Sequence, residues 1–149
     1  MKSYSSIMDN AKNLLAKALI GVHQQIYRIS GGRLLGSAKG MPVLELETIG
    51  RRSGKARTTM LTAPVHSDTQ LVIVASKAGA DHHPAWFLNL RDNPSVKVTM
   101  KGSTRAMKAR VANADEKAEL WPQIVAANDG YAGYQAKTER DIPVVILTY

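Results

Sequence analysis

The chain contains no cysteine, and aromatic residues make up only 5% of its 149 positions. The lack of cysteine excludes disulfide bonds, thiolate metal ligands and a cysteine nucleophile, and it fits a reducing compartment. Scarce aromatic side chains, with no basic helix and no known recognition motif, argue against nucleic-acid binding. We therefore expect a cytoplasmic protein that does not bind nucleic acid.

Acidic residues are also few, with 12 against 20 lysines and arginines, and the net charge is +8. This excess favours anionic partners, either a small polyanion or an acidic membrane face. No apolar run approaches the ~20 residues that a membrane-spanning helix needs. Residues 1–30 instead predict an amphipathic helix, because apolar side chains recur at helical spacing from Ile7 to Ile26 around Lys12 and Lys17. Docking of this helix on the domain is the favoured interpretation, and peripheral contact with the inner face of the cell membrane is a hypothesis.

The length fits one domain spanning residues 1–149, and no linker or internal repeat divides it. Alternating or short apolar runs predict strands at Val43–Thr48, Ala56–Val65, Leu71–Ala75, Val96–Met100, Thr104–Val111 and Ile142–Leu147. Helices are predicted from Pro84 to near Asn93 and Pro94, and from Asp115 to Ala127. This order does not alternate as βαβ units, so it favours an α+β fold built on a small antiparallel barrel.

The stretch from Thr48 to Thr62 is a candidate anion cradle between two strands. Two glycines permit a tight turn, and the cations and the hydroxyl that surround them are Arg51, Arg52, Ser53, Lys55 and Arg57. Arginine forks suit phosphate or carboxylate oxygens. A solvated, charged hairpin turn is the alternative on local spacing. A nucleotide-hydrolase phosphate loop is excluded, because Gly50 and Gly54 enclose three residues and Ala56 follows Lys55.

Few side chains indicate metal or acid–base chemistry. His82 and His83 are adjacent but lack further ligands nearby, so we expect solvated loop histidines and no metal site. Glu45 and Glu47 share one strand face, which is more often solvated or paired with cations than catalytic. Ser76 has no visible His and acid partners for a triad, although it can donate a hydrogen bond to a substrate oxygen.

Three aromatic residues remain as candidates. Burial in the core is the default explanation for Trp86. Tyr131 and Tyr134 stand beside Gly130 and Gly133, and glycine-flanked tyrosines tend to be mobile and surface-facing. They are therefore predicted either to close over a bound ring or to cover part of the core.

Four segments together resemble the deazaflavin (F420)-dependent nitroreductase family. They are Leu46–Arg57, Val74–Gly79, the Pro84–Leu90 segment with sequence PAWFLNL, and the Tyr131–Gln135 segment with sequence YAGYQ. The resemblance runs from about Pro42 to the C-terminus, and the order and spacing of four motifs make it more specific than any one of them. It implies a split β-barrel of about six mainly antiparallel strands with flanking helices.

The same resemblance implies reduced coenzyme F420 as cofactor, whose phosphodiester and polyglutamyl tail suit the basic cradle. By this likeness, the phosphate and tail would be bound by Arg51, Arg52, Ser53, Lys55 and Arg57, on a turn formed by Thr48, Gly50 and Gly54. Met60 and Thr62 would line the route to the ring, and Trp86 would pack beside it. The backbone around Ala75, Ser76 and Lys77 would hydrogen-bond the deazaflavin edge.

The implied reaction is hydride transfer from the cofactor to a quinone, nitroaromatic or similar acceptor, which needs little acid–base chemistry from the protein. Ser76 is expected to hydrogen-bond the acceptor, with Tyr131 and Tyr134 as its lid. Some members carry an aromatic residue where this chain has Asn128, which puts nitroimidazole reduction in doubt. The alternatives are an FMN-dependent enzyme on the same barrel, or a non-catalytic carrier of F420 or another anionic ligand such as a fatty acid. The sequence does not predict the natural acceptor or the oligomeric state.

Overall fold

The computed structural model describes residues 37–38 and 40–149, so the helix predicted from Ile7 to Ile26 lies outside the described residues. The described elements are β1 (Ser37–Ala38), β2 (Met41–Ile49), β3 (Ala56–Thr62), β4 (Val65–His66), β5 (Gln70–Val74), η1 (Lys77–Gly79), α2 (Ala85–Asp92), β6 (Ser95–Met100), β7 (Ser103–Val111), α3 (Ala114–Ala127), α4 (Gly130–Ala136) and β8 (Val144–Thr148). None of these helices is both long and apolar enough to cross a bilayer.

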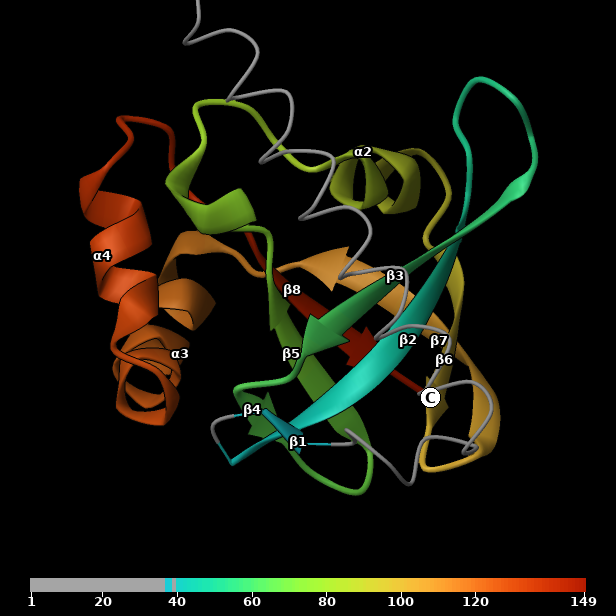
Figure 1. The fold of residues 1–149 in the computed structure, drawn as a ribbon, viewed down its shortest axis with the longest axis horizontal. Helices are drawn as coiled ribbons and strands as arrows, with labels where there is room; N and C mark the ends of the chain where they lie inside the picture. Colours follow the sequence, from blue (N-terminus) through green and yellow to red (C-terminus); the bar gives the residue numbers. More distant parts are fainter. Residues whose placement is uncertain (1–36, 39) are drawn as a thin grey trace, which may run out of the picture.

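The strands form one antiparallel sheet that curls into a split barrel (Figure 1). Their order is β1-β2-β6-β7-β8-β5-β4. In addition, β3 pairs with β2 along the edge opposite β6. The edge strands β3 and β4 are joined only by Ala63 and Pro64, and the Ala63 N–H donates to the Pro42 carbonyl at 3.0 Å. The two edges are therefore held close together by the chain itself. Apart from the two-residue strands β1 and β4, six strands build the described sheet, as predicted.

Two apolar clusters lie on opposite faces of β5 and β8. Inside the barrel, Ile73 and Val145 are fully buried with Leu44 and Leu46 of β2. On the outer face, the neighbouring positions of β5 and β8 pack against Ile124 of α3 and against α4. Because both faces are covered, β5 and β8 read as continuous apolar runs rather than alternating ones.

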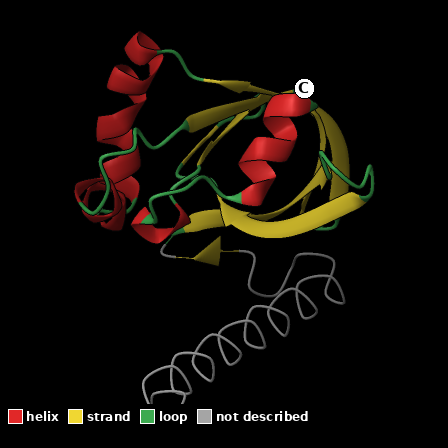
Figure 2. Cartoon of the chain, turned by 90° about the horizontal axis from the view of Figure 1, so that it is seen from above, coloured by secondary structure: helices red, strands yellow, loops and turns green. Residues whose placement is uncertain are grey.

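The three α-helices divide between these clusters. Figure 2 shows α2 over one end of the barrel, while α3 and α4 stand beside it. Phe87 and Leu90 of α2 are buried in the inner cluster. At the start of α3, the Asn113 side chain accepts from the Glu116 N–H at 2.9 Å and the Glu116 carboxylate accepts from the Asn113 N–H at 3.1 Å. This capping box fixes where α3 begins.

Most predicted elements are confirmed, and the differences have local causes. The strand predicted over Ala56–Val65 is broken at Ala63 and Pro64, where the chain passes from one sheet edge to the other. The strand predicted from Ile142 begins two residues later, after Pro143. Helix α4 was not predicted, since Gly130 and Gly133 lower helix propensity. Its inward tyrosine and its packing on η1 offset that local preference.

Candidate functional site

A cleft of about 580 Å³ lies between the β2–β3 turn, the start of α2 and the η1 segment. Its lining is rich in cations and hydroxyls, and the lining residues are Thr48, Gly50, Arg51, Arg52, Ser53, Arg57, Thr58, Thr59, Lys77, Pro84, Ala85, Trp86 and Asn89. Three sequence motifs that are far apart in the chain therefore meet at one place. Eight of the predicted cofactor-binding residues line the cleft, namely Thr48, Gly50, Arg51, Arg52, Ser53, Arg57, Lys77 and Trp86.

The β2–β3 turn is shaped by its two glycines. Gly54 has a φ of 69°, which favours glycine, and its N–H donates to the Gly50 carbonyl at 2.8 Å. The Gly50 N–H donates to the Lys55 carbonyl at 2.8 Å, and a Cβ at Gly50 would lie 2.6 Å from the Ser53 Oγ. The turn therefore closes tightly and leaves Arg51, Arg52, Ser53 and Lys55 exposed.

Asn89 holds this turn against α2, although the sequence analysis did not single it out. It is only 5% exposed, and its Oδ1 accepts from the Arg51 N–H at 3.2 Å and from the Arg51 Nη1 at 3.4 Å. Its Nδ2 donates to the Oγ1 of Thr48, which is 1% exposed, at 3.2 Å. One buried amide therefore fixes both the end of β2 and the first cation of the turn. A polar residue within the apolar PAWFLNL segment was the available signal.

The predicted residues of β3 lie on different faces of the strand. Arg57 is opposite Thr48 in the sheet register and lines the cleft. Met60 is opposite Glu45, and Thr62 falls on the same side of β3 as Met60. Met60 and Thr62 are half-buried and do not line the cleft. The Thr62 Oγ1 instead contacts the Tyr131 hydroxyl, in a second region beside the cleft.

The η1 segment connects the cleft with α4. Lys77 and Ala78 have φ values of 45° and 52°, an uncommon left-handed conformation for residues with a side chain. Lys77 lines the cleft, and its Nζ donates to the His82 Nε2 at 2.6 Å. A Cβ on Gly79 would lie 2.7 Å from the Tyr134 carbonyl, so η1 and α4 are in close contact. Ser76 is 9% exposed, and its side chain makes no cap hydrogen bond to η1.

The tyrosine pair occupies this second region, on α4. Tyr131 is only 7% exposed, and its hydroxyl lies 3.1 Å from the Thr62 Oγ1. The Tyr134 ring is half-buried and meets the Tyr131 ring edge-on, with centroids 6.0 Å apart. Burial raises the pKa of the Tyr131 hydroxyl, so it stays protonated at neutral pH. Of the two alternatives that the sequence left open, covering part of the core describes Tyr131, because its ring packs in the outer apolar cluster.

Among the described residues, no group of three or more His, Asp and Glu could hold a metal ion. His82 is exposed, whereas His83 is half-buried and lies 4.8 Å, centroid to centroid, from the Phe87 ring. The expectation of solvated loop histidines is therefore wrong for His83. Its Nδ1 contacts Arg140 at 3.0 Å, a residue that the sequence analysis also passed over.

A family model described as F420H(2)-dependent quinone reductase matches residues 19–149 of the chain. The chain belongs to this family. It is 38% identical over 135 residues to the F420H(2)-dependent quinone reductase Rv1261c of Mycobacterium tuberculosis, covering 87% of this chain and 89% of that protein. Rv3178 of the same organism, named a putative F420H(2)-dependent quinone reductase, is 38% identical over 112 residues, or 75% of this chain and 93% of that one.

A solved structure of an F420-H2 dependent reductase, FDR-A, superposes with a TM-score of 0.64 at 36% identity, covering 71% of this chain and 93% of that chain. The resemblance drawn from the four motifs is thus confirmed, together with the α+β split barrel and the assignment to F420H2-dependent oxidoreductases.

The residues of this family member suit F420 chemically. Arg51, Arg52 and Arg57 are guanidinium donors for a phosphodiester and acidic tail, and Trp86 offers a flat apolar surface. Within the described residues, the backbone N–H groups of Ser76, Lys77 and Ala78 donate to no protein acceptor. Successive unpaired N–H groups at a left-handed turn are suited to receive carbonyl or anionic oxygens.

Proposed function

We propose that the chain binds reduced F420 along one continuous path, with the tail in the cleft and the deazaflavin ring beyond Lys77. Arg51, Arg52, Ser53, Lys55 and Arg57 would hold the phosphodiester and the tail, on the turn made by Thr48, Gly50 and Gly54. The unpaired N–H groups next to Ala75, at Ser76 and Lys77, would bind the ring edge. Met60, Thr62 and Trp86 would border the ring. The observation that carries this proposal is that Lys77 lines the basic cleft while Gly79 touches α4.

When bound, the cofactor supplies the hydride. The chain then has to place an electrophilic acceptor against the ring, exclude water and stabilise the oxygen that gains negative charge. The Ser76 side chain makes no cap hydrogen bond to η1, and we assign its hydroxyl to the acceptor oxygen. Tyr131 stays protonated and shares a hydrogen bond with Thr62, and Tyr134 packs on its ring edge. The pair would form the rigid wall of the acceptor site, rather than a mobile lid.

The acceptor that we propose is a quinone, in line with the names of the family and of the relatives. The Asn128 side chain accepts from the Gly130 N–H at 3.0 Å, so this residue helps to begin α4. An aromatic ring at this position would not make that hydrogen bond. Because some members of the family carry an aromatic residue where this chain has Asn128, we do not extend the proposal to nitroimidazoles.

Titration of the pure protein with F420, FMN and haem, followed by oxidation of F420H2 with menadione, tests the proposal. We expect F420 to bind and its oxidation to require both protein and menadione. Affinity for FMN alone would contradict the cofactor assignment. Binding of F420 without oxidation that depends on the acceptor would indicate a carrier.

A further inference from the structure

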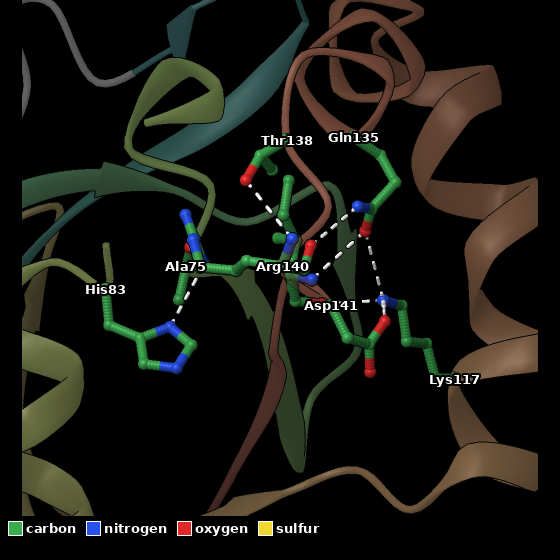
Figure 3. A network of polar contacts seen from close by, with 8 residues as sticks. Ala75, His83, Lys117, Gln135, Thr138, Arg140 and Asp141 are labelled. Atoms are coloured by element: carbon green, nitrogen blue, oxygen red, sulfur yellow. Dashed lines mark hydrogen bonds and ion pairs between the residues drawn. The ribbon is translucent and has the colours of Figure 1, made fainter. Parts of the chain in front are cut away.

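The Arg140 side chain reaches from the segment after α4 to the loop that carries Ser76 (Figure 3). Its guanidinium donates to three backbone carbonyls, from Nη1 to Ala75 at 3.2 Å, from Nη2 to Ser76 at 2.9 Å and from Nε to Ala80 at 2.9 Å. Nη1 also lies 3.0 Å from the His83 Nδ1. Because arginine only donates, the His83 Nδ1 accepts and the proton of the neutral ring is on Nε2.

Arg140 is itself held in place on both sides of its Cα. Its N–H donates to the Thr138 Oγ1 at 3.2 Å, and its carbonyl accepts from the Gln135 Nε2 at 2.8 Å. The Gln135 Oε1 accepts from the Ile142 N–H at 3.0 Å, and Lys117 of α3 donates to the Ile142 carbonyl at 2.7 Å (Figure 3). Arg140 therefore projects from a segment that is tied to both α3 and α4.

The direction of these carbonyls decides the direction of the neighbouring N–H groups. In a trans peptide, the C=O of one residue and the N–H of the next point in opposite directions, and no described peptide bond is cis. The carbonyls of Ala75 and Ser76 point toward Arg140, so the N–H groups of Ser76 and Lys77 point away from it. These are two of the N–H groups without a protein acceptor in the described part of the chain.

The turn is held by Arg140 and by the packing of Gly79 against α4. Lys77 and Ala78 are both left-handed, a conformation that persists in non-glycine residues only where surrounding contacts enforce it. Its own hydrogen bonds are short-range, from the Gly79 N–H to Ser76 and from the Ala80 N–H to Lys77. Arg140 is the long-range donor that binds the carbonyls before and after the turn.

We propose that Arg140 is a positioning residue of the cofactor site, which aims the N–H groups of Ser76 and Lys77 at the bound ring without contacting it. This inference rests on the proposed function, and it names the residue that holds in place the part of the site where the deazaflavin ring would bind. A charged donor also polarises the peptide groups that it binds, which strengthens the N–H groups on their far side.

The test compares wild type with Arg140→Met and Arg140→Lys, and uses Arg110→Met as the matched control. Arg110 is an exposed arginine whose ion pair is with Glu116, at 2.7 Å, outside the cleft. In cofactor-free protein, hydrogen–deuterium exchange should quicken at Gly79 and Ala80 in Arg140→Met, but not in Arg110→Met. The Kd for F420 in Arg140→Met should rise about ten- to one-hundredfold, since two oriented hydrogen bonds are lost.

Two further readouts separate positioning from other roles. The fold-change in Kd should be the same at low and high salt, unlike the loss of a cation that contacts the ligand. Arg140→Lys should bind F420 more weakly than wild type, because one ammonium group does not reproduce the guanidinium fork.

An unchanged Kd in Arg140→Met overturns the inference while leaving the proposed function intact, provided that wild type binds F420. Wild type without F420 affinity overturns both. If Arg140→Met does not fold, Arg140→Lys decides: wild-type affinity in that variant would show that charge suffices and that the fork positions nothing.

Discussion

At the scale of single residues, the contact between His83 and Arg140 makes the stability of the protein depend on pH. Burial lowers the pKa of His83 below its ordinary value of 6.5, and the positive charges of Arg140 and Arg91 lower it further. The other titratable groups around the same hollow are Asp81, His82 and Asp141. The ring accepts from Arg140 only while it is neutral. Protonation would therefore remove an acceptor and place two cations side by side.

The consequence for stability follows from the sign of this shift. Since the folded pKa of His83 lies below 6.5, the unfolded chain takes up the proton first as the pH falls. Above pH 6.5 we expect His83 to leave the free energy of unfolding unchanged. As the pH falls below 6.5, the free energy of unfolding should decrease, and the decrease should end once the pH is below the pKa of His83 in the folded state. His83→Asn, which keeps an acceptor near the position of Nδ1, should flatten this part of the profile.

Urea unfolding at a series of pH values from 5 to 8 measures the effect, with His66→Asn as control. His66 is exposed on β4, away from the cluster. Equal changes of the profile in both variants would contradict the assignment to His83.

At the scale of elements, Asn89 is the polar contact between α2 and the β2–β3 turn. In Asn89→Leu the side chain keeps its branching at Cγ, but the buried Thr48 hydroxyl and the Arg51 N–H lose their partner. We expect a loss of about 1–3 kcal/mol in the free energy of unfolding, measured by urea denaturation. The Kd for F420 should rise as well, because Arg51 is no longer held.

Asn93→Leu is the matched control at the exposed end of α2, where the side chain accepts only from the neighbouring Ser95 N–H in the contacts described. Surface changes of this kind usually stay within about 0.5 kcal/mol. Similar losses in the two variants would show that the buried amide has no special role.

The sequence predicted the strands better than the helices, for physical reasons. Period-two patterns such as Val96 to Met100, and short apolar runs such as Leu71 to Ala75, mark strands directly. Helix α4 was not predicted because its stability comes from packing on η1 and on the outer cluster, and not from the helix propensity of its residues. The break at Ala63 and Pro64 had a local signal, since a proline within a strand pattern argues against a continuous strand, and the prediction overlooked it.

The site was predicted where charge and glycine spacing mark it, at Gly50 to Arg57. The sequence missed Asn89 and Arg140, whose importance comes from long-range hydrogen bonds. Asn89 stands out only as a polar residue within an apolar segment, and Arg140 has no distinctive neighbours, so the folded arrangement is needed to reveal their partners. The glycine neighbours of Tyr131 left both a mobile lid and a position over the core open, and its burial is visible only in the fold.

At the scale of the whole molecule, the net charge of +8 is expected to draw an anionic cofactor toward the chain, while the cradle provides the specific contacts. Replacing Arg52 and Lys55 together by Gln should raise the Kd for F420 about three- to thirtyfold at low salt, with a smaller difference at high salt. The kcat at saturating cofactor should stay near that of wild type, because in the proposed binding mode these residues hold the tail and not the ring.

Lys97→Gln with Lys108→Gln is the control pair, since both lysines are exposed on β6 and β7 and neither lines the cleft. An equal loss of affinity in the two double variants would assign the effect to overall charge. A loss of kcat with unchanged Kd in the variant that lacks Arg52 and Lys55 would show that the cradle holds the reacting ring of the cofactor and not its tail.

The strand order also governs when the protein can become active during its synthesis. β8 is translated after every other described strand, yet it lies between β7 and β5, pairing Ala109 with Leu147 and Ile73 with Val145. Until β8 emerges from the ribosome, β5 and β7 are open edges and the outer cluster lacks one of its walls. The segment that carries Arg140 emerges just before β8. The nascent chain therefore closes its barrel at about the same stage as Arg140 becomes able to bind the loop that carries Ser76.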